Sequence, residues 1–208
     1  MNLDALEDNL VFTIPNGYRT FVSRGYCDLS ALDTTYLWVN EAEWIPLEAI
    51  PSRNMWRDNP LPGLVPFAFT GGGDNWCWNT NQPTSKSEYE ILMCYRDDDF
   101  AARYAPDFPS WFYRTCLDFA SCVDIDAGEI EDARKHLQLW SLRLAEIGPS
   151  DWADHLGALA KSTPSSFIRC FNEREYAEFG FLTHDDIANI VRERFGPSYL
   201  DRTVEWGS

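Results

Sequence analysis

Apolar residues recur at alternating steps of three and four between residues 130 and 147, which is the spacing of an amphipathic helix. The apolar positions of this stretch are Ile130, Ala133, Leu137, Trp140, Leu144 and Ile147. Asp126 and Glu129 precede it at the spacing of a capping box, and Gly148 and Pro149 follow it as a stop signal. A heptad seam this short favours a helix docked on its own chain over a dimer zipper.

Four other segments have helical spacing, and each is bounded by a start or stop signal. The predicted helices run over residues 16–25, 109–122, 150–159 and 183–196. Pro15 suits the first turn of the first of these helices. Ser150 is expected to cap the third helix, and Thr183 forms a second capping box with Asp186.

Period-two patterns predict a hairpin in the stretch from Leu61 to Asn79. Leu64 to Phe69 is a short apolar run, typical of a buried strand, and Trp76 to Trp78 resumes as a second strand with both indoles on one face. Glycine takes positive φ without strain, so the residues between the strands predict a structural turn: Gly71, Gly72, Gly73 and Asp74. A phosphate-binding loop is the weaker interpretation, since no Lys and Ser/Thr follow and no helix opens after the glycines.

Other strands are predicted at Leu37 to Val39, Tyr89 to Tyr95 and Phe167 to Phe171, although the pattern of the last also allows a helix. The polar stretch from Asn79 to Glu88 predicts a loop. Together the patterns predict an α+β fold, with a mainly antiparallel twisted sheet, packed helices and a mostly helical C-terminal extension. We place the division at residue 125, into 1–125 and 126–208, with the second part packed on the first.

The chain is strongly acidic. Its 208 residues include 33 acidic and 17 basic side chains, for a net charge of −16. Repulsion from phosphates argues against nucleic acid and anionic membranes as partners, whereas a basic protein partner or simply a well-solvated surface fits the excess. No apolar run approaches the roughly 20 residues of a membrane helix. There is no signal-peptide pattern and no CxxC motif, so we predict a reducing, cytoplasmic setting.

Candidate catalytic and metal-binding groups are weak. His184 lies beside Asp185 and Asp186, but adjacent residues on a helix point apart, and the helix dipole explains carboxylates in a first turn. The strand that ends at Tyr95 is followed by three carboxylates without the further ligands of a calcium loop: Asp97, Asp98 and Asp99. No GxSxG motif and no activated cysteine is evident. We therefore predict no catalysis, no cofactor and no metal site.

Three motifs resemble the SUKH superfamily, which groups fungal cell-wall-synthesis regulators with bacterial immunity proteins that neutralise polymorphic toxins. They are the central LPGLVPFAFTGGGDNWCWN (61–79), the upstream IPNGYRTFV (14–22) and the downstream YAPDFPSWF (104–112). The resemblance covers roughly residues 10 to 125. It departs from the usual pattern at Gly25-Tyr26-Cys27, where Asn-Gly is common, and the C-terminal extension lies outside it.

The resemblance implies an α+β, SUKH-like domain and an immunity protein that binds and neutralises a toxin domain, such as a basic nuclease. Acidic residues beside the central hairpin are the expected contacts, with a tryptophan as anchor if one is exposed: Glu88, Asp97, Asp98, Asp99, Trp76 and Trp78. The alternatives are a non-catalytic regulatory module without a toxin partner and, less favoured, a small-molecule enzyme. A monomer or a weak homodimer is expected.

Overall fold

The computed structural model describes residues 7–8, 10–27, 42–52, 63–85, 87–123, 127–171 and 174–205. The predictions for the strand at Leu37 to Val39 and for the capping box at Asp126 fall outside these residues.

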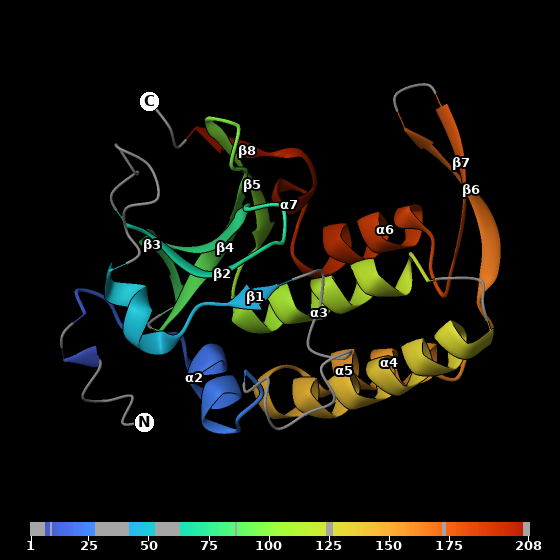
Figure 1. Ribbon diagram of the computed structural model, residues 1–208, viewed down its shortest axis with the longest axis horizontal. Helices are drawn as coiled ribbons and strands as arrows, with labels where there is room; N and C mark the ends of the chain where they lie inside the picture. Colours follow the sequence, from blue (N-terminus) through green and yellow to red (C-terminus); the bar gives the residue numbers. More distant parts are fainter. Residues whose placement is uncertain are drawn as a thin grey trace.

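A six-stranded antiparallel sheet forms one end of the molecule (Figure 1). In spatial order its strands are β1 (Glu43–Trp44), β2 (Leu64–Phe69), β3 (Asn75–Ser85), β4 (Glu88–Cys94), β5 (Phe100–Ala105) and β8 (Thr203–Glu205). A 3-10 helix, η3 (Leu47–Ser52), follows β1 and precedes β2 in the chain. Strands β2 to β5 follow one another as hairpins, and β8 returns from the C-terminal part of the chain to pair with β5. The predicted antiparallel α+β fold is confirmed.

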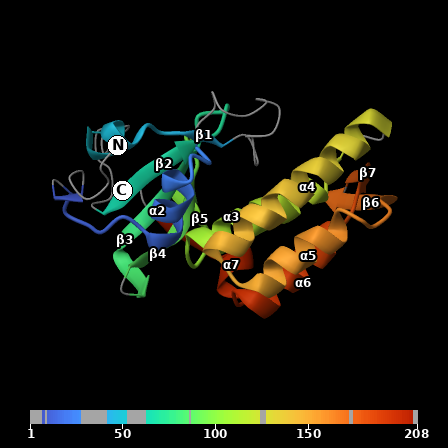
Figure 2. The same cartoon turned by 90° about the horizontal axis from the view of Figure 1, so that it is seen from below.

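The helices extend from this sheet towards the far end of the molecule, where a separate two-stranded hairpin protrudes (Figures 1 and 2). The helices are α2 (Asn16–Ser23), α3 (Phe108–Ala120), α4 (Ala127–Ile147), α5 (Ser150–Leu159), α6 (His184–Arg194) and α7 (Ser198–Asp201). The hairpin consists of β6 (Ser165–Phe171) and β7 (Arg174–Gly180), so the predicted strand from Phe167 is confirmed.

The start signals of two helices can be compared with their sequence predictions. The Thr183 hydroxyl accepts a hydrogen bond from Asp186 N at 3.1 Å, and Asp186 Oδ2 accepts one from Thr183 N at 2.9 Å, which confirms the capping box of α6. At α5 the cap prediction is wrong by one residue. Ser150 is already the first helical residue, and the extended N-cap residue is Pro149, whose side chain has no atom that could accept a capping hydrogen bond.

The core is built from aromatic rings on one face of the sheet. Phe67 stacks on Trp78 at 4.8 Å between ring centroids, and Trp111 of α3 meets Phe67 edge-on at 5.2 Å. Trp76 lies in the same core, whereas Cys77 between the two tryptophans belongs to a smaller buried cluster on the opposite face. The alternation confirms that both indoles share one face of β3.

Two stretches of the sheet were not foreseen. Residues 79–85 continue β3, in which Asn79 pairs with Leu64 of β2, and Pro83 and Ser85 pair with the start of β4, so the predicted loop from Asn79 to Glu88 is wrong. The polar side chains of residues 81–85 correctly indicate that these residues are exposed. They do not indicate whether the backbone forms hydrogen bonds with a neighbouring strand, and those hydrogen bonds define a β-strand. Strand β5 has the sequence FAARYA, and its alanines lack the β-branched character that marks a strand.

The end of β7 lies backbone to backbone against the end of α3. Phe181 N donates to Ala120 O at 2.7 Å, and Val123 N donates to Phe179 O at 2.9 Å. A Cβ added at Gly180 would lie 2.7 Å from Ala120 O and from the Ser121 carbonyl group. Glycine at 180 therefore permits the close approach that joins the protruding hairpin to the core helix.

Substitution of Gly180 by alanine is expected to lower the free energy of unfolding by about 1–3 kcal/mol, because the backbone it meets cannot rotate away as a side chain would. Urea unfolding followed by circular dichroism measures the change. Gly157→Ala is the matched control, because Gly157 lies within α5 and its added Cβ would meet only the Ser141 hydroxyl, at 3.3 Å. Equal urea midpoints for the two variants would show that the close approach at Gly180 is not needed.

Candidate functional site

Two hairpin turns lie together at one end of the large sheet. The first connects β2 to β3, and the second, between β4 and β5, carries the acidic triplet. Asp74 of the first turn accepts a hydrogen bond at Oδ1 from Arg96 N of the second, at 3.0 Å. The acidic turn surface, as we call it, consists of the half-buried Asp74 of the first turn and the exposed residues of the second turn, which are Tyr95, Arg96, Asp97, Asp98, Asp99 and Phe100.

The first turn, which contains three consecutive glycines, is held in a fixed shape by hydrogen bonds. Gly73 N donates to Thr70 O at 2.9 Å, and the Thr70 hydroxyl accepts from Asp74 N at 3.1 Å. Of the three consecutive glycines, only Gly73 has a positive φ, at 90°. A Cβ at Gly73 would also lie 2.9 Å from Arg96 Cδ. Glycine at this position therefore allows the two turns to pack against each other.

The three aspartates are exposed at the tip of the second turn. Asp98 Oδ1 accepts from Phe100 N at 3.2 Å, which orders the turn, and Asp97 pairs with Arg96 at 3.6 Å in a solvated ion pair that contributes little to stability. Large aromatic side chains flank the carboxylates on both sides, with Tyr95 41% exposed and Phe100 46% exposed. Partial burial and the Asp74 carboxylate raise the pKa of Tyr95, so its hydroxyl remains a hydrogen-bond donor at neutral pH.

Tyr95 and Phe100 were not among the sequence candidates. The sequence did contain a signal for them, because an aromatic residue stands on each side of a run of charged residues at the end of a strand. An aromatic side chain in that position lies at the edge of the turn, where no further strand covers its ring. Exposed aromatic rings are typical anchors of protein-binding surfaces, and carboxylates beside them favour a partner of opposite charge.

Glu88 lies away from the acidic turn surface, at the opposite end of β4. Its Oε1 accepts from Gly17 N at 2.9 Å and its Oε2 from Phe108 N at 3.4 Å, so one carboxylate joins the first turns of α2 and α3. Burial raises the pKa of Glu88, and these backbone hydrogen bonds oppose the rise. Trp76 and Trp78 are buried in the core, so the exposure on which their role as anchors depended is absent.

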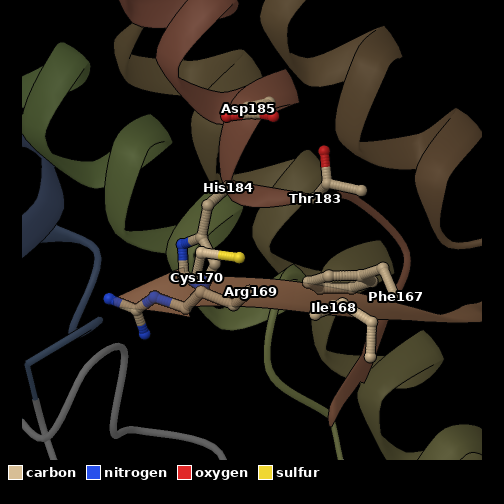
Figure 3. A pocket seen from close by; sticks show the side chains of 7 residues that line it. All are labelled: Phe167, Ile168, Arg169, Cys170, Thr183, His184 and Asp185. Atoms are coloured by element: carbon tan, nitrogen blue, oxygen red, sulfur yellow. The ribbon is translucent and has the colours of Figure 1, made fainter. Parts of the chain in front are cut away.

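A cavity of about 420 Å³ lies at the base of the protruding hairpin, between β6 and the start of α6 (Figure 3). Glu178 of β7 connects its two sides, because its carboxylate pairs with Arg169 at 3.3 Å and with His184 Nε2 at 2.8 Å. His184 therefore has an acidic partner that holds the hairpin to α6. Within the described ranges, no group of three or more His, Cys, Asp or Glu side chains is arranged to hold a metal ion.

The fold and the acidic turn surface describe an α+β protein whose exposed chemistry suits contact with another protein. Residues 2–114 match the SMI1 / KNR4 family (SUKH-1), and the chain belongs to this family. Comparison with curated proteins and with solved structures found no match. The family match runs through β5 and ends within α3.

Membership of this family supports a protein-interaction or immunity-type role. The acidic turn surface lies wholly within the matched residues. None of the helices in the described part of the chain is both long and apolar enough to cross a lipid bilayer.

Proposed function

We propose that this protein is a cytoplasmic immunity protein that binds a toxin domain with a basic surface and blocks it by binding, without catalysis. The observation that carries the proposal is the acidic turn surface, where three exposed carboxylates lie between two exposed aromatic side chains. Family membership and the net charge of −16 support the same assignment.

The chemistry of the surface fits a basic partner in two ways. Carboxylates attract lysine and arginine side chains and accelerate the encounter with a positively charged protein. They also resemble the phosphates that a nuclease binds, so an acidic surface can occupy a nucleic-acid site. The rings of Tyr95 and Phe100 provide apolar area that is covered only in the complex.

The test removes three charges and keeps the side-chain shape. A variant with Asp97, Asp98 and Asp99 changed to Asn is expected to bind its toxin domain about tenfold more weakly or worse, mainly through slower association. The partner is first identified by a pull-down from source-cell lysate with the purified protein as bait. A basic partner is expected to be retained at low salt and released as the salt concentration rises. Binding kinetics with the purified partner then measure the loss, and growth of cells that express the toxin measures protection.

A control variant removes the same charge elsewhere. Asp154→Asn, Glu175→Gln and Glu193→Gln change exposed residues of α5, β7 and α6, and they raise the net charge from −16 to −13, as the first variant does. We expect this control to keep affinity within about threefold of the unchanged protein. Equal losses in both variants would show that only total charge matters, and an unchanged affinity of the first variant would remove this surface from the proposal.

A further inference from the structure

A second cavity, of about 510 Å³, lies between the end of α2 and the C-terminal half of α4. Figure 1 shows these two helices side by side. The cavity walls are formed by charged and apolar side chains, which are Arg24, Tyr26, Leu139, Leu142, Arg143 and Glu146. None of these residues belongs to the acidic turn surface.

Arg143 is the unusual member of this set. Its side chain is on the core side of α4, with the residue only 4% exposed, and its guanidinium lies over the Tyr26 ring at 4.7 Å from the centroid. The buried Nε has no hydrogen-bond acceptor, and in the described part of the chain no carboxylate pairs with this guanidinium. Burial lowers the pKa of Arg143, but a guanidinium keeps its charge at neutral pH.

A buried cation without a counter-ion is costly, and stacking on one aromatic ring offsets only part of that cost. The nearest acidic member of the cavity does not supply the missing charge. Glu146 Oε2 pairs with Arg24 Nε at 2.9 Å, and Glu146 Oε1 accepts from the Tyr26 hydroxyl at 3.1 Å. The cavity walls therefore carry two cations and one anion that is already paired, which leaves the single positive charge of Arg143.

The apolar part of the cavity gives the shape of a complementary ligand. Leu142 is 65% exposed, and Leu139 is half-buried one turn earlier on α4. A ligand with an apolar body would cover both leucines while its charged end reached Arg143. One uncompensated charge in a strongly acidic protein favours a monoanion, and a planar guanidinium matches a carboxylate with two parallel hydrogen bonds.

We propose that this cavity binds the carboxylate of an apolar monoanion, with the carboxylate on Arg143 and the apolar body over Leu139 and Leu142. Two sources share this chemistry: a small free carboxylic acid, and the terminal carboxylate of a peptide that ends in an apolar residue. The site adds a second binding activity to the proposed toxin contact and does not depend on it.

Hexanoate is the first probe, and hexanamide is its neutral control. Titration calorimetry on the full chain is expected to show binding of one hexanoate per protein, and a matching rise in the thermal midpoint, with neither effect from hexanamide. The second arm uses the peptide acetyl-Gly-Gly-Leu with a free terminal carboxylate, compared with its terminal amide. Binding of hexanoate alone assigns a small acid, and binding of the free-acid peptide alone assigns a chain terminus.

Two variants test the assignment to Arg143 and the leucines. Arg143→Met keeps an unbranched side chain about as long as the aliphatic part of arginine and removes the charged guanidinium, and we expect it to weaken binding of the carboxylate probe about tenfold or more. Leu142→Glu places a negative charge on an exposed wall, where water can hydrate it in the folded protein, and should weaken binding to a similar extent. Circular dichroism establishes that both variants are folded.

The proposal is overturned if neither carboxylate probe binds, or if the amides bind as well as the acids. It is also overturned if either Arg143→Met or Leu142→Glu binds the carboxylate with unchanged affinity.

Discussion

Residues 1–125, produced without residues 126–208, are expected to lose the cooperative unfolding transition of the full chain. The reason is the position of α3, which is buried on every side: the sheet covers one face, and α4, α5 and α6 cover the others (Figure 1). Phe119 meets Trp140 edge-on at 4.9 Å, and Tyr113 stacks on Trp152 at 4.9 Å. A cut at residue 125 would expose these faces of the core helix to water.

Polar connections cross the same boundary. The Tyr113 hydroxyl shares a hydrogen bond of 2.7 Å with His155 Nδ1, and Arg114 Nη1 donates to Tyr199 O at 2.8 Å. The truncated chain also lacks β8, which completes the β5 edge of the sheet. Each large apolar side chain that becomes exposed costs about 1.5–3 kcal/mol, so losing several removes most of the roughly 5–15 kcal/mol that stabilises a typical domain.

Near-ultraviolet circular dichroism of the fragment reports the fixed packing of aromatic side chains, and urea unfolding reports whether the transition is cooperative. As the control, residues 126–208 are co-expressed with residues 1–125 as a separate chain, and we expect the mixture to regain a single cooperative transition. We thus propose that the two predicted parts fold as one unit. A fragment 1–125 that unfolds cooperatively by itself, with the aromatic signal of the full chain, would contradict this proposal.

The parts of the fold that sequence predicts well are those in which one local pattern coincides with one buried face. α4 was foreseen because its apolar spacing continues over the whole helix, and β3 because two tryptophans alternate with a smaller residue. β5 was missed, since Ala101 and Ala105 are buried by neighbours distant in sequence and the pattern of the strand itself carries little information. The pairing of β8 with β5 likewise joins residues about 100 positions apart, so no pattern within either segment indicates it.

The candidate sites divide in the same way. The acidic triplet is evident in sequence because charge and position at a strand end are local properties. The role of Glu88 is not, because the two backbone N–H groups that it joins belong to Gly17 and Phe108, far apart in the chain. Arg143 has the spacing of an ordinary helix residue, and only the packing of α2 against α4 shows that its charge is buried.

Acidification from neutral pH is expected to destabilise the protein through His136. This side chain lies on α4 between two aromatic rings, parallel to Trp140 at 5.3 Å and edge-on to Phe119 at 5.4 Å, and the residue is only 7% exposed. Burial lowers the pKa of His136 from its ordinary 6.5 to about 4, because the imidazolium would lose its hydration between the rings. The Asp132 carboxylate opposes this shift without cancelling it.

The sign of the effect follows from which state binds the proton more readily. Between pH 6.5 and about 4 the unfolded chain is protonated at His136 while the folded chain remains neutral. The stabilising contribution is therefore complete above pH 6.5 and is lost as the pH falls towards 4. One unit of pKa difference corresponds to about 1.4 kcal/mol, so a loss of about 1–3 kcal/mol is expected across this range.

His155 adds to the same trend, because burial and the nearby Arg194 guanidinium lower its pKa as well. Glu88 acts in the opposite direction, since burial raises its pKa and protonation then favours the folded state. A measurement on the unchanged protein alone would combine all three groups, so the contribution of His136 requires a variant that cannot titrate at this position.

His136→Phe is that variant, because an aromatic ring remains between Phe119 and Trp140 while the titratable group is gone. Urea unfolding at a series of pH values from about 7.5 to about 4.5 gives the free energy of unfolding of both proteins. The variant should lose about 1–3 kcal/mol less than the unchanged protein over that range, whatever its stability at neutral pH. Parallel curves for the two proteins would mean that His136 titrates alike in the folded and unfolded states, and that the aromatic pocket does not exclude its charged form.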